Sequence, residues 1–358
     1  MTRFIIRRLI SSIPVLLGVV LLIFVLVRLI PGDPCTATYG EKATPALCAA
    51  FEARYGLDRP IPEQFVIYAG ALVQGDLGSS IKFGRPVTDL LIERLPVTVE
   101  LTIVALVFAT FFGVILGVLS ATRRNSPADA GTMVIANLGV STPVFVLGLL
   151  LAYVFAVLLK DTPLALPPSG RLSPGVTVIP LAVSWGLEDL SGAPRAILDF
   201  FSNMYVFNTL ITLQLPAFVD ASKHLILPAI AVGTIPLAII ARMTRSSLLE
   251  VLGLDYVRTA RAKGLKEQSV VVRHGMRNAL LPVVTVIGLS LGAFLSGAIL
   301  TETIFNLTGM GKTLFEAING RDYIVVQGVT LVVAITYLVV NLVVDVSYAF
   351  LDPRIRLG

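Results

Sequence analysis

Six long apolar runs separated by polar segments dominate the pattern along this chain. A helix needs about 20 apolar residues to cross the hydrocarbon core of a bilayer. Only helices and closed barrels satisfy their backbone polar groups in lipid, and runs of this length are helical. The pattern therefore predicts an all-α membrane protein with six transmembrane helices at residues 9–30, 97–121, 132–159, 225–241, 283–304 and 324–351.

Basic residues mark one side of these spans. Arg123 and Arg124 follow the second span, and residues 242–277 contain eight Lys or Arg against three acids. Short cytoplasmic loops carry such an excess of positive charge. With three arginines before the first span and Asp352–Arg356 after the last, the rule predicts both termini in the cytoplasm. The first run is too long for a signal peptide and lacks a small-residue cleavage site.

Two long polar segments then lie outside the cytoplasm. Residues 31–96 follow the first span and have the apolar positions of a small folded cap, so residues 1–96 form one unit and 97–358 the main transmembrane domain. Residues 160–224 are predicted to be an extracytoplasmic insertion with short interfacial helices. The alternative of eight spans, with crossings at 176–187 and 205–219, would place three acids and one base inside and is disfavoured.

The cap segment contains both cysteines of the chain, Cys35 and Cys48. An oxidising compartment favours disulfides. A bridge would close a loop of about 14 residues and contribute on the order of 3 kcal/mol in the chain-entropy model. The alternative is that they are two unrelated small apolar residues.

Composition excludes several classes of function. The 358 residues are 55% hydrophobic and 14% charged, well below the charge of an average soluble protein. The net charge of +5 clusters beside spans, which indicates orientation and not nucleic-acid binding. Two His and two Cys form no zinc cluster, so no metal site is predicted. Residues 309–313 fail the frame of a phosphate-binding P-loop and follow no strand.

Residues 255–282 form the longest strongly polar segment between two apolar spans. Asp255 lies where a helix N-terminus favours an acid, and Lys263 where its C-terminus favours a base. Gly264 then fits a left-handed helix cap. We predict two short helices that meet at this glycine, the second running to about Ala279, with Pro282 opening the next apolar run. On its own, such a basic loop could serve only to fix orientation.

This segment resembles the coupling loop of ABC importer permeases. The match lies in a triplet near Thr259, Ala260 and Arg261, the glycine at 264, and the Leu280-Leu281-Pro282 ending. The sequence of residues 255–264 is similar to that of the dipeptide, oligopeptide and nickel branch of these permeases. The Glu that is usual in the motif of the whole family is absent in this branch. Other matching pieces are 31–34, 55–60, 75–80, 302–305, 321–323 and 341–354, so the resemblance covers nearly the whole chain.

The resemblance implies a type I ABC importer transmembrane domain in a prokaryotic plasma membrane. Expected partners are a second, similar permease, two cytoplasmic ATPase subunits that bind ATP and Mg, and an extracytoplasmic binding protein. The chain would form half of a pathway for di- or oligopeptides or a related small solute. Its cargo-contacting residues are not identified. The expected coupling residues are Asp255, Tyr256, Arg258, Thr259, Ala260, Arg261, Ala262, Lys263, Gly264, Asn278 and Pro282, with Ala260 facing a partner helix.

Two other classes of function compete with this interpretation. An ion-driven secondary transporter would favour internal repeats and mid-membrane acids. An intramembrane enzyme would need a paired nucleophile and base, yet only His224 and His274 are present. We expect the acid Asp345 to be structural and paired with a base such as Arg242 or Arg354, and Glu100 and Glu302 to be structural as well. The insertion near residues 185–203 looks longer than the usual outer loop of the family.

Overall fold

The computed structural model describes residues 2–29 and 32–351, with side chains in these ranges except 2–3, 293, 295–297 and 347–351. These described residues are helical apart from connecting loops and one isolated β-bridge between Ser79 and Pro86. The elements in chain order are α1 (Thr2–Leu29), α2 (Pro34–Tyr39), the 3₁₀ turn η1 (Gly40–Lys42), α3 (Pro45–Tyr55), α4 (Ile61–Val73), α5 (Val87–Thr122), α6 (Pro127–Ser141), α7 (Val144–Tyr153), the π-helix η2 (Val154–Leu158), α8 (Leu181–Ser184), α9 (Gly192–Ser202), α10 (Tyr205–Ile211), α11 (Leu215–Leu252), α12 (Asp255–Ala262), α13 (Glu267–Ser269), the π-helix η3 (Val270–Gly275), α14 (Met276–Gly297), α15 (Ile299–Ile304), α16 (Met310–Asn319) and α17 (Tyr323–Leu351).

Five helices of the described chain are long and apolar enough to cross a membrane, and a bent pair makes a sixth. They correspond to the six spans predicted from the sequence. The five are Phe4–Leu29, Val87–Thr122, Leu215–Leu252, Glu267–Gly292 and Tyr323–Val346, and the pair is Pro127–Ser141 with Val144–Leu158. The eight-span alternative is wrong for the described residues, because its extra crossings are α8 and α10, of four and seven residues.

The bent pair corresponds to the third predicted span, which contains the polar residues Ser141 and Thr142 followed by Pro143. The chain bends by 106° between the two halves of this pair, around Thr142 and Pro143. Thr142 ends α6, and its hydroxyl donates to the carbonyl of Leu138 at 2.8 Å. Proline cannot continue the hydrogen-bond ladder of α6, so a sharp break at this point has a local cause.

The core of the bundle is the crossing of α5 and α11. Glycines allow their backbones to approach closely, as small residues do between membrane helices. A Cβ at Gly117 would lie 2.6 Å from the carbonyl oxygen of Ala241, and one at Gly233 would lie 2.9 Å from that of Ala105. Any side chain larger than hydrogen at these positions would push the two helices apart.

The cap predicted for residues 31–96 consists of α2, η1, α3 and α4. Phe51 is buried between Tyr39 and Tyr55, with ring centroids 6.1 and 4.7 Å away. The helix α4 packs Phe65 onto Phe24 of α1, with ring centroids 5.1 Å apart. Cys35 and Cys48 are joined by a disulfide that links α2 to α3.

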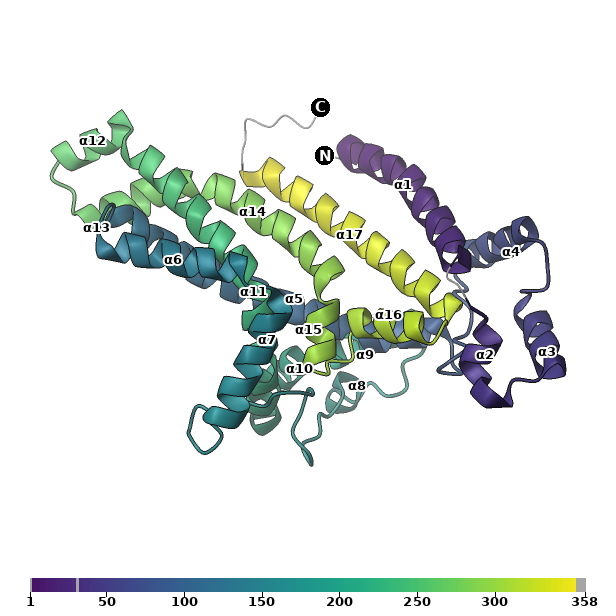
Figure 1. The fold of residues 1–358 in the computed structure, drawn as a ribbon. Coiled ribbons are helices and arrows are strands. Elements are labelled where there is room, and N and C mark those ends of the chain that lie inside the picture. The colour runs from purple at the N-terminus through teal and green to yellow at the C-terminus, as the bar shows by residue number, and fades with distance from the viewer. Residues whose placement is uncertain (1, 30–31, 352–358) are drawn as a thin grey trace.

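Figure 1 shows α10 and α15 at the opposite end of the bundle from α12, and two buried acids, Glu100 and Glu302, organise this end. Glu100 of α5 accepts hydrogen bonds from the first backbone amides of α10, at 2.7–3.1 Å, and pairs with Arg171 at 3.5 Å. Glu302 accepts from the Thr98 hydroxyl at 2.6 Å and from the amide of Lys312 in α16 at 3.0 Å. These contacts support the structural roles expected for both acids. The connection between the fifth and sixth predicted spans, residues 305–323, contains the helix α16.

Candidate functional site

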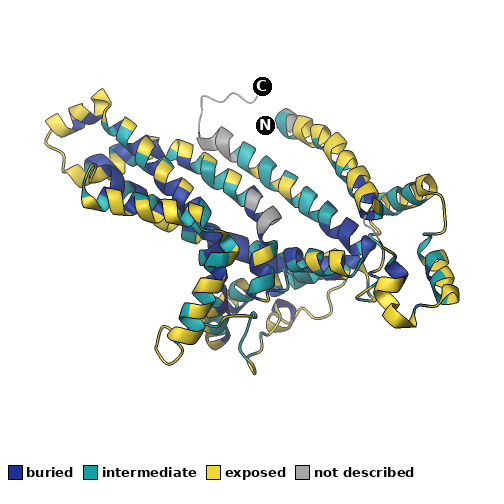
Figure 2. Cartoon of the chain, in the orientation of Figure 1, coloured by how far each residue is buried: buried dark blue, intermediate teal, exposed yellow. Residues whose placement is uncertain are grey.

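The segment singled out by the sequence forms a polar helix and turn at one end of the bundle. The helix α12 projects beyond the long helices, on the same side as the first turn of α1 and the last turns of α17 (Figure 1). It begins at Asp255, whose carboxylate favours the helix N-terminus, and ends at Ala262 after Arg261 in its last turn. Most of its surface is exposed (Figure 2).

The left-handed conformation predicted for Gly264 is confirmed, with φ +76°. Its amide donates to the carbonyl of Arg261 at 2.9 Å, and the amide of Leu265 donates to that of Ala260 at 3.4 Å. This pair of bonds closes the helix as a Schellman cap does. A Cβ on Gly264 would meet no atom within 4 Å, so the position needs a glycine for its backbone and not for space.

Two apolar side chains hold α12 on the bundle. Val257 and Ala260 are buried, with 0% and 7% of their surface exposed. They pack into a cluster that we call the α12 cluster, whose buried members come from α5, α11, α12, η3 and α14: Ala121, Leu248, Val251, Val257, Ala260, Val270, Val271 and Ala279. The expectation that Ala260 faces a partner is therefore wrong, because its side chain packs against its own chain.

A polar contact ties the same helix to the start of α14. The Asn278 amide donates to the Tyr256 hydroxyl at 2.8 Å, and that hydroxyl donates to the carbonyl of His274 at 3.3 Å. Asn278 and Tyr256, both predicted members of the site, are thus brought together across 22 residues of sequence.

A bidentate ion pair crosses the glycine turn. The Arg261 guanidinium donates to both carboxylate oxygens of Glu267, at 2.7 and 3.1 Å. These hydrogen bonds raise the pKa of Arg261 above its ordinary value. The pair joins the last turn of α12 to the first residue of α13. The exposed glycine turn is thereby bridged by side chains as well as by its backbone bonds.

The solvent-exposed face of α12 and its flanking residues is basic and contains a few apolar side chains. The predicted members Asp255, Arg258, Thr259, Ala262 and Lys263 all point to solvent, as do Leu254 and Leu265, with 46% and 42% exposed. Neither leucine was among the predicted site residues, although both flank α12 directly. A basic face with exposed leucines suits a groove on another protein more than open water.

Pro282 and the second helix differ from the prediction. The second helix does not stop near Ala279 before a new run. Instead α13, η3 and α14 follow one another without a break, and Pro282 lies inside α14. The π-helix η3 absorbs the irregular start of this helix, as π-bulges do inside α-helices.

A partly buried ion pair, not predicted from the sequence, lies next to the α12 cluster. Arg245 of α11 donates from Nε and Nη2 to the Asp129 carboxylate at 2.8 and 2.9 Å, and the Ser120 hydroxyl donates to the same acid. Ser126, Pro127 and Asp129 form a helix-start pattern that could have located the acid. The network joins α5, α6 and α11 next to the α12 cluster.

His224 lies in a polar cluster at the other end of α11. Its Nε2 lies 3.3 Å from the Ser173 hydroxyl, which donates to Asp220 at 2.6 Å. In a catalytic triad the carboxylate accepts from Nδ1 of the histidine. Here Nδ1 faces the carbonyls of Ser169 and Gly170 at 3.1 Å, so the cluster fastens the loop before α8 to α11.

The family of the chain follows from its similarity to known proteins. Residues 113–357 match the family described as the binding-protein-dependent transport system inner membrane component. Residues 1–102 match the N-terminal membrane component of the same kind of system. The chain belongs to this family. Its fold is that of a type I ABC importer transmembrane domain, and it is a multi-pass protein of the plasma membrane that works as a transport permease beside a binding protein and ABC partners.

Relatives of this permease match along its full length. A dipeptide transport system permease protein of Alkalihalophilus pseudofirmus is 44% identical over 356 residues, which cover 99% of this chain and 100% of the relative. A di/tripeptide transport system permease protein of Pseudomonas aeruginosa is 46% identical over 357 residues, with 99% of both chains covered. A dipeptide transport system permease protein of Escherichia coli is 44% identical with the same coverage. The insertion near residues 185–203 is therefore no departure from these relatives, which have nearly the same length.

Proposed function

We propose that this permease subunit forms half of the pathway of an ATP-driven importer of dipeptides and other short peptides. The peptide cargo is proposed because the chain is 44–46% identical to peptide permeases over almost its entire length. Similarity of this extent includes the pathway helices and the outer segments alike. An ion-driven secondary transporter is not supported by any of these relatives.

The partners follow from the same proposal. A second, similar permease completes the pathway, two ATPase subunits bind ATP and Mg on the cytoplasmic side, and a binding protein delivers the peptide outside. This chain itself hydrolyses no ATP. The basic α12 end faces the cytoplasm with both termini, and α9 and the cap face outward, in accordance with the charge bias of the short loops.

Coupling is proposed to run through α12 and its glycine turn. The helix projects from the bundle, presents a basic face with Leu254 and Leu265, and is anchored by Val257 in the α12 cluster. A rigid projection that is firmly joined to the ends of the pathway helices can receive a movement from an ATPase and pass it on.

The test uses a matched pair of glycines. Gly186 has the same cap as Gly264: φ +66°, a bond from its own amide to Val183, a bond from the amide of Leu187 to Ala182, and no atom within 4 Å of a Cβ. It lies after α8, away from α12. Gly264→Trp and Gly186→Trp therefore add the same bulk and a similar backbone strain, of about 1–2 kcal/mol, to opposite ends of the molecule.

Each variant is purified with its partner permease, without the binding protein, and the amount of retained ATPase is measured. ATP-driven uptake of a labelled dipeptide into proteoliposomes follows, with the binding protein added. We expect Gly264→Trp to keep the partner permease but to lose ATPase and uptake, and Gly186→Trp to retain ATPase like the parent. Equal ATPase retention by both variants would show that α12 does not dock on the ATPase and serves only to fix the orientation of the chain in the membrane. Uptake of other solutes, but not of peptides, by the parent would overturn the cargo.

A further inference from the structure

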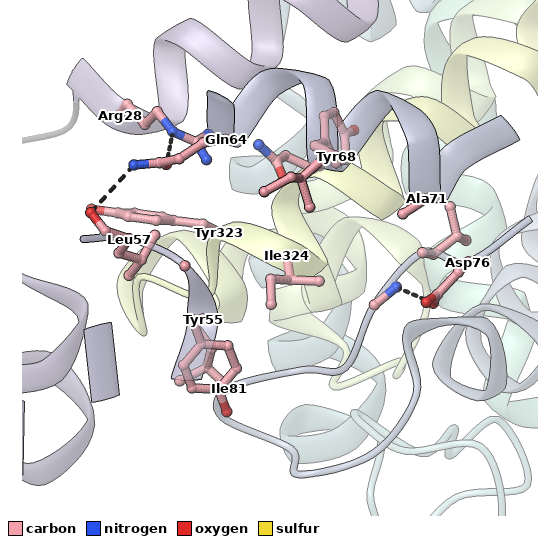
Figure 3. Close-up of a pocket in the computed structure, with 15 residues that line it drawn as sticks. Arg28, Tyr55, Leu57, Gln64, Tyr68, Ala71, Asp76, Ile81, Tyr323 and Ile324 are labelled. Atoms are coloured by element: carbon pink, nitrogen blue, oxygen red, sulfur yellow. Dashed lines mark hydrogen bonds between the residues drawn. The ribbon is translucent and has the colours of Figure 1, made fainter. Parts of the chain in front are cut away.

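A cavity of about 210 Å³ lies where the cap meets the main domain. Its wall is built from the end of α1, from α3 and α4, from the loop at 76–81 and from the first residues of α17 (Figure 3). Leu57, Ile81, Tyr323 and Ile324 supply apolar surface. The cavity lies apart from α12 and from the ATPase-facing end.

Two polar groups in this wall have no hydrogen-bond partner. They are the hydroxyl of Tyr68 and the amide nitrogen Nε2 of Gln327, whose side chain belongs to a residue only 5% exposed. Burying an unsatisfied donor is costly, and such groups in folded proteins normally face a partner. Burial raises the pKa of Tyr68 to about 12, so its hydroxyl remains a neutral donor. Both groups are therefore donors that lack an acceptor oxygen.

The cavity also has a charge of each sign. Arg28 donates through Nε to Gln64 at 2.9 Å and stacks on the Phe24 ring at 3.4 Å, which orients its guanidinium. Asp76 accepts from the amide of Gly78 at 2.8 Å through one carboxylate oxygen. Neither residue forms an ion pair within the part of the chain that the structure describes. Figure 3 shows Arg28 and Asp76 at opposite ends of the wall.

A solely structural origin explains only part of this arrangement. A cation suits the last turn of α1, because the helix C-terminus is partially negative. Water could fill the space. Neither accounts for two unpartnered donors beside an unpaired cation, with an unpaired carboxylate at the far end. A small molecule with an anionic group and an ammonium group would satisfy all four.

We propose that this cavity binds a small zwitterion, with its carboxylate or phosphate at Arg28, Tyr68 and Gln327 and its ammonium at Asp76. Two sources offer this chemistry: a free amino acid or short peptide, and the headgroup of phosphatidylethanolamine. Because the wall joins the cap to α1 and α17, the bound zwitterion also clamps the cap onto the main domain.

The test measures binding to the complex as purified with its accompanying subunits, in nanodiscs and without ATP. In phosphatidylglycerol nanodiscs, which contain no ammonium lipid, dialanine is titrated by calorimetry, with N-acetyl-dialanine amide as the uncharged counterpart. In mixed nanodiscs, native mass spectrometry detects retained phosphatidylethanolamine. Saturable binding of dialanine, without binding of its uncharged counterpart, identifies a free amino acid or peptide as the ligand. Retained phosphatidylethanolamine identifies the lipid headgroup as the ligand. Since no transport is measured, the result is separate from the cargo proposed above.

Tyr68→Phe is the deciding variant, because it removes only the unpartnered hydroxyl and leaves the ring on Phe24. Tyr39→Phe is its control in the same cap, outside the cavity wall. We expect Tyr68→Phe to weaken binding about 10- to 100-fold without lowering the melting temperature, as loss of a hydrogen bond to a charged group does. Asp76→Asn should weaken dialanine but not acetate. Parent-like binding by Tyr68→Phe, or no saturable zwitterion from either source, overturns the proposal.

Discussion

Arg8 of α1 and Asp345 of α17 form an ion pair, with 2.7 Å between Nη2 and Oδ2. The sequence predicted a structural role for Asp345 with a partner such as Arg242 or Arg354. Arg354 lies outside the described residues, and Arg242 contacts Asn137 at 3.5 Å instead. The partner is a base that had been interpreted only as an orientation signal. The first and last spans are therefore joined by charge as well as by apolar contact.

We expect Arg8→Leu and Asp345→Leu each to destabilise the permease, because each leaves a charge in or near lipid without its partner. The double variant should be less destabilised than the sum of the two, with a coupling free energy of about 1–2 kcal/mol. Thermal unfolding of the three variants in nanodiscs measures this cycle. Additive effects would show that the pair contributes nothing.

Substitutions at Ala260 and Ala262 distinguish two roles of α12, which are packing against its own chain and docking on the ATPase. Ala260 is buried in the α12 cluster, whereas Ala262 is exposed. We expect Ala260→Trp to overpack the cluster, to cost about 1–3 kcal/mol of stability and to lose ATPase. Ala262→Trp should lose ATPase with unchanged stability. Thermal unfolding and co-purification are measured on both. A parent-like melting temperature for Ala260→Trp would contradict the packing described for α12.

Removal of the Cys35–Cys48 bridge should loosen the cap. The two cysteines are 13 residues apart, so the chain-entropy model gives a loss of about 3 kcal/mol for the double Ser variant. Hydrogen exchange should rise in α2 and α3 while the long helices are unchanged. Mass spectrometry of the folded parent under non-reducing conditions is the direct control. Two alkylatable thiols there would refute the bridge.

The sidedness of the two ends can be measured with single cysteines in a background without Cys35 and Cys48. Gly192→Cys at the start of α9 should react with an impermeant thiol reagent in intact cells, once any outer membrane is permeabilised. Lys263→Cys beside α12 should react only after lysis. The opposite pattern would invert the orientation proposed here.

Local chemistry explains what the sequence could predict. Gly264 follows a helix with an acid at its start and a base at its end, so its left-handed cap could be predicted from neighbouring residues alone. The spans were predictable because lipid imposes length and apolarity on each one separately. Their exact ends were less so: α5 begins ten residues earlier than predicted, at Val87, with Pro96 tolerated inside the helix.

The features that escaped prediction depend on distant parts of the chain. Asp129 and Arg245 are 116 residues apart, and Arg8 and Asp345 further still. Ala260 is buried only because α5, α11 and η3 converge under α12. The cavity beside Tyr68 joins three segments that no local pattern relates. A single sequence offers periodicity and caps, but not these pairings.

The helix α11 is long enough to connect the two ends of the bundle. Its 38 residues measure about 57 Å, from the outer helix α10 to the α12 cluster. Its closest contacts with α5 lie near its middle, at Gly113, Gly117 and Gly233. A tilt of about 5° around that point would move each end by roughly 2.5 Å in opposite directions. Because α11 is one continuous helix, a movement at its α12 end would also shift its outer end, next to α10.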